Sequence, residues 1–148
     1  MFEKIAVGFD GSEPSERALT LACDLAGKYG SEIHLVYTPQ PPTVAYAMGA
    51  IPGYQTAAIM PAAEEVREAN KKVMAQGKSI VENCGQTLSE THIKTGDPGD
   101  VLVGYAESCG ADLIVLGRRG LGALGAIVQG STSVRVNHIA KCATLSVV

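Results

Sequence analysis

The sequence predicts an α/β fold in which a doubly wound, five-stranded parallel sheet carries helices on both faces. Segments with strand character alternate with segments of helical periodicity along the chain. The strand segments are short, continuous apolar runs, which is typical of parallel strands covered on both faces. The chain has 148 residues, 46% of them apolar. We therefore expect one domain spanning residues 1–148, large enough to bury a core without a disulfide or a metal.

The first strand and helix are expected directly at the amino end. Residues 3–9 are mostly apolar and predict a buried strand. The sequence Asp10-Gly11-Ser12 ends this strand, and Ser12 and Ser15 offer hydroxyl groups that can cap the next helix. Residues 14–29 carry apolar side chains at helical spacing, and Gly30 is the residue type that commonly ends a helix.

A second strand at residues 33–38 leads into a connection that is unusually long for a compact domain. Residues 39–61 contain five prolines, two glycines and several large apolar side chains. A tolerated surface insertion, a lid and an oligomer contact all fit this composition. A polar-rich helix is then expected at residues 64–84. Its predicted inward face consists of Val66, Val73, Ile80 and Val81.

The remaining elements continue the alternation of strands and helices. We expect a strand at 88–95, a helix starting at Asp97-Pro98-Gly99-Asp100, a buried strand at 112–116, a helix at 131–140 and a last strand at 144–148. A helix between each pair of successive strands predicts a parallel sheet, in which the strand–helix–strand connections are right-handed. Ligands of such sheets bind beyond the carboxyl ends of the strands, near the reversal of strand order.

Charge is distributed unevenly along the chain. Residues 1–112 carry eight basic and fifteen acidic side chains, a net charge of −7, whereas residues 113–148 carry four basic and no acidic ones, a net charge of +4. The total of −3 argues against a nucleic-acid binder, which needs a broad basic surface, but permits a small anion site. We see no signal peptide and no apolar run near 18 residues, so we expect a cytoplasmic protein without a membrane partner.

The residues most often used in metal and nucleophilic chemistry are dispersed. The cysteines form no CxxC motif and no cluster with histidine, and we expect each to be a small buried apolar side chain: Cys23, Cys84, Cys109 and Cys142. The three histidines are also expected to be structural, because none is clearly next to the candidate site described below: His34, His92 and His138. We assign no catalytic residue.

Glycine is concentrated in one stretch, since five of the 17 glycines lie between Gly117 and Gly130. A buried strand ends before this stretch and a helix begins after it. Glycine lets backbone N–H groups approach a ligand closely, and a helix N-terminus adds free N–H donors and a positive dipole end. The stretch also supplies hydroxyl and guanidinium donors, from Arg118, Arg119, Ser131, Thr132 and Ser133. The pattern favours a phosphate ligand.

Two common nucleotide motifs are excluded by their context. Residues 120–125 match GxGxxG, but no acidic residue follows them, and the match does not come after the first strand of its unit. The sequence Gly77-Lys78-Ser79 has the ending of a P-loop, but Lys72 occupies the position of the motif's first glycine.

The spacing Gly117-x2-Gly120-x9-Gly130-Ser131 is the GxxG-x9-G[ST] signature of the ATP-binding universal stress proteins, which this sequence closely resembles. Matching segments cover nearly the whole chain, at residues 7–12, 96–98, 110–117 and 136–148. The resemblance implies a Rossmann-like fold of the adenine nucleotide alpha hydrolase-like kind. It also implies a stress-response protein that takes ATP, with Mg²⁺, as its ligand.

The resemblance further implies which residues form the site. In the family, the position of Asp10 lies near the ribose or the metal-bound phosphates, so Asp10 is the candidate Mg²⁺ ligand. The position of Thr38 contacts adenine through its backbone. The other expected nucleotide-binding residues are Gly8, Phe9, Leu116, Gly117, Arg119, Gly120, Gly130, Ser131, Thr132 and Ser133.

The expected function is that of an ATP-dependent regulatory or signalling module. Any hydrolysis should be slow, because Asp10 is the one plausible carboxylate and no general base can be assigned. A nucleotide-free dimeric interaction module and a relative that binds AMP or cAMP remain as alternatives. The resemblance implies a homodimer joined through the C-terminal strand, and a further protein partner is left open. Asn137, Thr144 and Ser146 depart from the family's usual residues near that strand.

Overall fold

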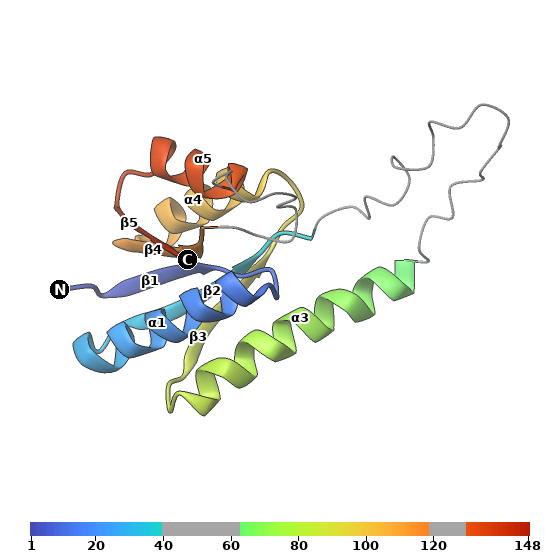
Figure 1. Cartoon of the computed structure of the whole chain (residues 1–148), viewed down its shortest axis with the longest axis horizontal. Helices are drawn as coiled ribbons and strands as arrows, with labels where there is room; N and C mark the ends of the chain where they lie inside the picture. Colours follow the sequence, from blue (N-terminus) through green and yellow to red (C-terminus); the bar gives the residue numbers. More distant parts are fainter. Residues whose placement is uncertain (40–62, 119–129) are drawn as a thin grey trace, which may run out of the picture.

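The computed structural model describes residues 1–39, 63–118 and 130–148 (Figure 1). Its strands are β1 (Lys4–Gly8), β2 (Glu32–Tyr37), β3 (Leu88–Ile93), β4 (Leu113–Gly117) and β5 (Ala143–Val147). Its helices are α1 (Glu13–Tyr29), α3 (Ala63–Asn83), α4 (Pro98–Cys109) and α5 (Ser131–Ile139). The predicted alternation is confirmed in these ranges. The segment predicted at 39–61 lies, apart from Pro39, outside the described residues, as do Arg119 and Gly120.

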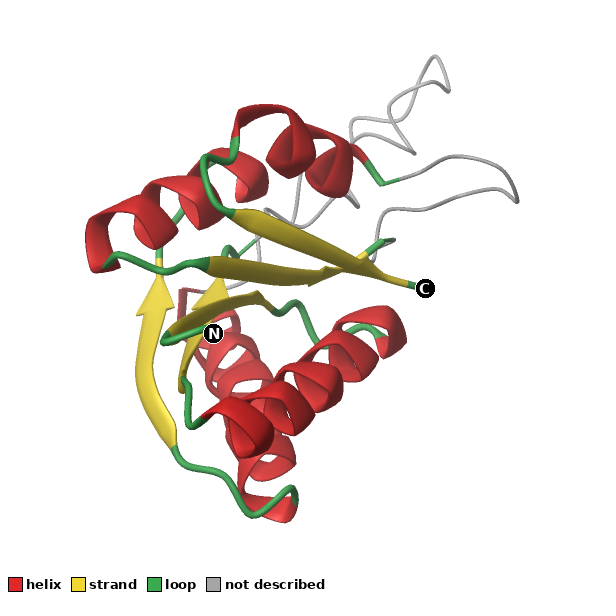
Figure 2. Ribbon diagram, turned by 90° about the vertical axis from the view of Figure 1, so that its left-hand side faces the viewer, coloured by secondary structure: helices red, strands yellow, loops and turns green. Residues whose placement is uncertain are grey.

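The five strands form one sheet in the order β3-β2-β1-β4-β5, and each neighbouring pair is parallel. Helices α1 and α3 lie on one face, and α4 and α5 lie on the other (Figures 1 and 2). The predicted doubly wound parallel sheet is therefore confirmed. The chain moves outward from β1 to β2 and β3, and then returns to the other side of β1 for β4 and β5. The strand order thus reverses between β1 and β4.

Both faces of the sheet are buried, which explains why its central strands are apolar at successive positions. On β1, Ile5 and Val7 belong to the core under α1 and α3, whereas Ala6 belongs to the core under α4 and α5. All three side chains are fully buried. This alternation follows from the period of two in a strand, where successive side chains point to opposite faces.

Helix α3 packs on the sheet with only part of its predicted inward face. Val81 is fully buried, and Val73 and Ile80 are partly buried against the same core. The prediction for Val66 is wrong, because 37% of this residue is exposed. The reason is visible in Figure 1, where the first turns of α3 project beyond the edge of the sheet.

The ends of two helices follow the predicted local chemistry. Gly30 ends α1 with a left-handed backbone, φ 72°, and its N–H donates to the Ala26 carbonyl. Asp97 caps α4, since its Oδ1 accepts a hydrogen bond of 3.0 Å from the Asp100 N–H. These contacts satisfy backbone groups that a helix end leaves without intrahelical partners.

Two of the polar departures near the C-terminal strand interact with each other. The Thr144 hydroxyl donates to Asn137 Oδ1 at 2.8 Å, so a residue of β5 is tied to one of α5. On the opposite face of β5, Leu145 and Val147 pack against the core under α1. The polar side chains therefore point to the α5 side of the strand, and the apolar ones point to the α1 side.

The cysteines differ in their environment. Cys23 is buried as predicted, Cys109 and Cys142 are half-buried, and Cys84 is exposed, which contradicts the prediction for that residue. All four are free thiols. Within the described parts of the chain, no helix combines the length and the apolar character needed to cross a membrane.

Candidate functional site

The candidate site lies at the carboxyl ends of β1 and β4, where the strand order reverses. At such a point the connections that leave two neighbouring parallel strands run to opposite faces of the sheet. In sheets of this kind, ligands bind outside the carboxyl ends of these strands. The sheet therefore brings Asp10, which follows β1, to the same edge as Gly117 at the end of β4. Helices α1 and α5 begin at this edge, so their N-terminal ends face the same region.

The turn after β1 is organised around Asp10. Its Oδ1 accepts hydrogen bonds from the Ser12 N–H at 2.9 Å and from the Ser12 hydroxyl at 2.5 Å. The Ser15 hydroxyl donates to the Ser12 carbonyl at 2.8 Å and accepts from the Asp10 N–H at 3.3 Å. Ser12 occupies the N-cap position of α1 but makes no side-chain cap. The expected capping role of its hydroxyl is wrong, because Asp10 takes that hydroxyl instead.

The end of β2 lies beside this turn. Thr38 is buried, and Tyr37 is half-buried with its hydroxyl donating to Asn70 Oδ1 of α3 at 3.2 Å. Burial, and then the negative charge of Asp10, raise the pKa of Tyr37. Tyr37 therefore remains a neutral hydrogen-bond donor at physiological pH. Sequence reasoning missed Tyr37 and Asn70 as neighbours of the site, because no local pattern links the two residues.

The end of β4 and the start of α5 are held together at the backbone. The Gly130 N–H donates to the Arg118 carbonyl at 2.9 Å, and the Arg118 N–H donates to the Val147 carbonyl at 2.6 Å. The Ser133 hydroxyl lies 3.1 Å from the Arg118 carbonyl oxygen and 2.9 Å from that of Gly130. These contacts place the first turn of α5 directly beside the carboxyl end of β4.

The three predicted hydroxyl groups of α5 differ in their surroundings. Ser133 is only 1% exposed and is engaged with backbone carbonyls, whereas Ser131 is exposed and Thr132 is half-buried. The first N–H groups of an α-helix have no carbonyl partner within the helix. Backbone N–H groups and the Ser131 and Thr132 side chains are therefore the donors that α5 presents at this edge.

Other predicted site residues can face a ligand only through their backbone. The side chains of Phe9 and Leu116 are buried in the two cores. A Cβ added at Gly8 would lie 2.9 Å from Leu102 Cδ2. One added at Gly117 would lie 2.9 Å from the carbonyl carbon of Pro14. Gly117 is thus required by packing against the backbone at the start of α1, whatever it contributes to a ligand, whereas at Gly8 a shift of the Leu102 side chain would make room.

The positive charge of residues 113–148 is partly neutralised by a neighbouring helix. Arg135 Nε lies 2.9 Å from Asp100 Oδ1, and Lys141 Nζ lies 3.1 Å from Glu107 Oε1. Both carboxylates belong to α4 and precede residue 113 in sequence. Arg118, at the end of β4, is exposed beside the start of α5. The hydrogen bond from the Gly130 N–H to the Arg118 carbonyl holds Arg118 close to the start of α5.

Two histidines of the sheet have partners within the fold, and the described residues form no metal-binding cluster. No group of three or more histidine, cysteine or acidic side chains in them has the arrangement of a metal site. His34 is buried in β2, with its Nδ1 2.9 Å from the Tyr105 hydroxyl and its Nε2 3.3 Å from Glu32 Oε2. His92 stacks on the ring of Tyr105, with centroids 4.4 Å apart. Both histidines therefore contact the Tyr105 side chain.

Comparison with known proteins links this geometry to one family. The model of the Universal stress protein family matches residues 1–147. The chain is 30% identical over 148 residues to the universal stress protein in the QAH/OAS sulfhydrylase 3′ region of Thermus aquaticus, with 99% of both chains covered. It is 27% identical over 153 residues to universal stress protein YxiE of Bacillus subtilis, again with 99% of both chains covered.

Solved structures show the same architecture. The universal stress protein UspA from Lactobacillus plantarum is 26% identical, with a TM-score of 0.75 over 99% of this chain and 97% of that one. A universal stress protein in complex with cAMP has a TM-score of 0.72 at 23% identity, covering 99% and 97% of the two chains. The universal stress protein from Archaeoglobus fulgidus in complex with dAMP has a TM-score of 0.68 at 23% identity, covering 99% and 98%. The last two similarities are similarities of fold.

Proposed function

Because this chain belongs to the universal stress protein family, we propose that it binds an adenine nucleotide at the carboxyl ends of β1 and β4. We further propose that the bound nucleotide sets the state of a regulatory module. The observation that carries the proposal is the first turn of α5, which begins beside the end of β4 at the reversal of strand order. The relatives solved with cAMP and with dAMP support the nucleotide class.

The phosphate groups are assigned to the start of α5. The N-terminal turn provides backbone N–H donors and the positive end of the helix dipole, both of which favour an anion. Ser131 and Thr132 add hydroxyl donors, and Arg118 adds charge. Gly130 has φ −57° and ψ 139°, an extended conformation that any residue can adopt. We therefore assign its lack of a side chain to the close approach of the ligand.

The nucleoside is assigned to the ends of β1 and β2. Asp10 is a hydrogen-bond acceptor at this edge of the sheet, suited to a ribose hydroxyl, and Thr38 supplies backbone groups to the base. Tyr37 and its partner Asn70 border this region from β2 and α3.

Among adenine nucleotides, we propose ATP with Mg²⁺ as the ligand. Mg²⁺ typically keeps several waters and takes one or two carboxylates together with phosphate oxygens. A single carboxylate, that of Asp10, fits this mode of binding, and the metal would neutralise phosphate charge. The described residues near the turn offer no histidine as a base, since His34 is bonded to Tyr105. We therefore propose that ATP acts mainly as a ligand. Sustained turnover well above about 1 s⁻¹, a rate typical of kinases, would instead make the protein an enzyme.

We also propose a cellular compartment and an oligomeric state for this protein. We propose that the protein works in the cytoplasm, where its free thiols would stay reduced. We propose that it works as a homodimer joined through β5. Both proposals are independent of nucleotide binding, so either can be wrong while the binding proposal is right.

Calorimetry with a panel of nucleotides tests the proposal. We expect ATP to bind more tightly in the presence of Mg²⁺ than in its absence, and more tightly than ADP, AMP or cAMP. Mass spectrometry of the ligand released from freshly purified protein would identify what the cell supplies. If none of the four nucleotides binds at millimolar concentration, the proposal is wrong, and a nucleotide-free interaction module is favoured.

A Gly130→Val variant locates the binding site. The substitution is compatible with the backbone of Gly130 but places a branched side chain in front of the α5 donors, so binding should weaken at least a hundredfold. The matched control is Gly104→Val, on the exposed face of α4, where an added Cβ meets no atom within 4 Å. The control should bind as the unmodified chain does. Equal affinity of the two variants would show that the phosphates do not bind at the start of α5.

A further inference from the structure

Helix α3 lies against the turn that follows β1. A Cβ added at Gly11 would lie 3.7 Å from Val73 Cγ2 and 3.3 Å from Gln76 Oε1, so two side chains of α3 meet the backbone of this turn. The Gln76 amide nitrogen also donates to Glu16 Oε1 in the first turn of α1. These contacts make α3 a wall of the candidate site, on the face of the sheet that α1 also covers.

The end of β2 lies beside the same turn. β1 pairs with β2 as far as Val36, and Phe9, the residue after β1, donates its N–H to the Val36 carbonyl at 2.9 Å. The parallel pairing therefore continues past the end of β1 and brings Asp10 next to the backbone of Tyr37 and Thr38. Because the nucleoside is assigned to Asp10 and Thr38, Tyr37 borders the proposed position of the base.

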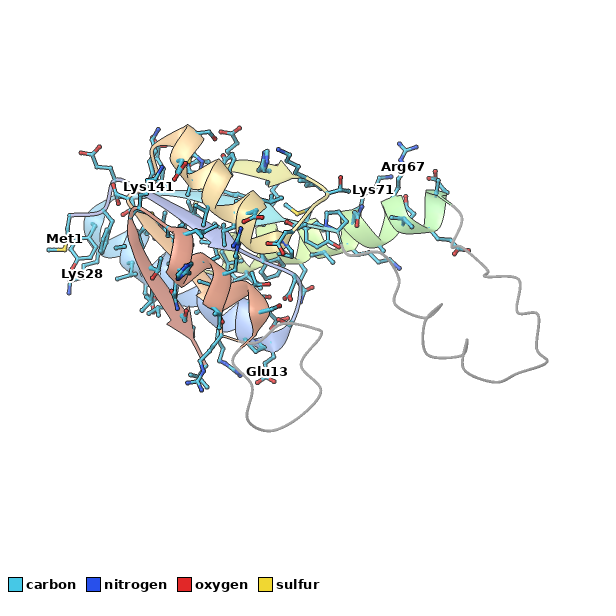
Figure 3. The ribbon with its side chains drawn as sticks, turned by 90° about the horizontal axis from the view of Figure 1, so that it is seen from above. Met1, Glu13, Lys28, Arg67, Lys71 and Lys141 are labelled. Carbon is cyan, nitrogen blue, oxygen red and sulfur yellow. The ribbon has the colours of Figure 1, made fainter. Side chains whose placement is uncertain are left out.

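An amide of α3 is held at this place by the last residue of β2. The Tyr37 hydroxyl donates to Asn70 Oδ1 at 3.2 Å, and both residues are half-buried. Asn70 precedes Val73 by three residues, so the two share the face of α3 that meets the turn after β1. Figure 3 shows Lys71, the next residue of α3, towards the end of the molecule at which α1 begins with Glu13. The Asn70 amide therefore lies at the end of the sheet where the nucleoside is assigned.

The hydroxyl contact fixes which way the Asn70 amide faces. Burial, and then the charge of Asp10, raise the pKa of Tyr37, so its hydroxyl keeps the proton that it donates. Donation to Oδ1 places the amide oxygen on the side of Tyr37 and leaves the two N–H donors of Nδ2 on the other branch of the amide. A carbonyl oxygen accepts two hydrogen bonds, so Oδ1 can accept one more. The amide thus presents an acceptor and a donor in a fixed order.

This step rests on the proposed function: we propose that the Asn70 amide recognises the base of the bound nucleotide and selects adenine, and that Tyr37 is a positioning residue that fixes the amide. Adenine presents an amino donor beside a ring-nitrogen acceptor, and an asparagine amide pairs with both at once. Hypoxanthine presents the reverse order, a carbonyl acceptor beside a ring N–H donor. An amide held in one orientation matches one of these orders, whereas an amide that is free to turn over can match either.

Calorimetry with ATP and inosine triphosphate tests this assignment, because the two nucleotides share the sugar and the phosphates and differ in the base. In the presence of Mg²⁺, the unmodified chain should bind ATP about tenfold more tightly than inosine triphosphate. Asn70→Ala removes both hydrogen-bonding groups, so it should weaken ATP binding by about tenfold and abolish the preference. Tyr37→Phe removes only the hydroxyl that orients the amide. It should weaken ATP, strengthen inosine triphosphate, and so reduce the preference.

The matched control is Asn83→Ala, an exposed asparagine at the other end of α3, which should keep both affinities. The ratio of the two affinities separates base recognition from a structural role, since a disturbed α3 would weaken both nucleotides by the same factor. An unchanged ratio in Asn70→Ala, or equal affinities in the unmodified chain, would overturn the assignment and leave nucleotide binding in place. An unchanged ratio in Tyr37→Phe would refute the positioning role. Failure of the unmodified chain to bind either nucleotide would overturn the proposed function, and the assignment with it.

Discussion

At the scale of single residues, the structure distinguishes residues of the glycine-rich stretch that serve packing from those that are available to a ligand. Gly117 was expected to serve a ligand, and yet its missing side chain is already accounted for by the backbone of Pro14 and Ser15 at the start of α1. Ser133 was expected to donate to phosphate, and its hydroxyl lies against two carbonyl groups instead. Among the described residues of this stretch, Gly130 and Ser131 keep the strongest case for a direct role with a ligand.

The packing role of Gly117 predicts a stability effect in the absence of any nucleotide. Gly117→Ala places a Cβ 2.9 Å from backbone and side-chain atoms of Pro14, so the free energy of unfolding should fall by about 1–3 kcal/mol. Gly104→Ala is the control, since it adds a Cβ in open space within α4 and should stabilise by about 0.5–1 kcal/mol. Urea unfolding of the ligand-free protein measures both. Equal stability of the two variants would refute the packing explanation.

At the scale of elements, local sequence signals predicted the helix ends better than the burial of whole helix faces. The caps at Gly30 and Asp97 form as expected, because each depends on groups within a few residues. The exposure of Val66 was not predictable, because the periodicity of α3 continues past the edge of the sheet that it covers. A helical pattern states which side chains share a face but not how far the opposing surface extends.

The cap of α4 predicts a measurable loss on substitution. Asp97→Ala removes the oxygen that accepts the Asp100 N–H, so stability should fall by about 1 kcal/mol. Asp97→Asn retains an acceptor oxygen at the same position and should lose much less. Chemical denaturation of the two variants side by side provides the comparison. An equal loss in both would assign the effect to the charge of Asp97 rather than to its hydrogen bond.

At the scale of the whole molecule, folding pairs basic side chains of residues 113–148 with acidic side chains of the preceding residues. The charge difference between the two parts of the sequence is therefore smaller on the surface of the folded protein. Arg135 and Lys141 form ion pairs with Asp100 and Glu107 of α4, so the positive end of the sequence does not translate into an equally positive surface. These pairs are exposed and contribute little stability individually. Because these two basic side chains are paired, the anion-binding proposal rests on the start of α5 and on Arg118.

The outer edge of β5 predicts how two copies would associate. The Ala143 N–H donates to the carbonyl of Asp112, just before β4, and the Val147 carbonyl accepts from Arg118, just after it, so odd-numbered residues of β5 pair towards β4. By the alternation of a strand, the N–H groups of Thr144 and Ser146 point to the free edge. We expect a dimer in sedimentation velocity at micromolar concentration. Ser146→Pro, which removes an outward N–H, should convert it to a monomer.

The side chain of Ser146 provides the matched control for this experiment. In the part of the chain that the structure describes, its hydroxyl is buried without a hydrogen-bond partner. Ser146→Ala removes that hydroxyl and keeps the N–H, so the dimer should persist. A dimer that survives Ser146→Pro unchanged would exclude pairing through this edge, and a monomeric unmodified chain would exclude the homodimer.

The sequence alone determined which segments become strands and helices, where several of them end, and which stretch has the spacing of a nucleotide-binding family. These properties depend on periodicity, capping and glycine positions, which are local. The tertiary structure decided the strand order that brings Asp10 and Gly117 to one edge, and also the contact between Tyr37 and Asn70. Such juxtapositions join residues far apart in sequence, and they arise only when helices and sheet pack into a common core.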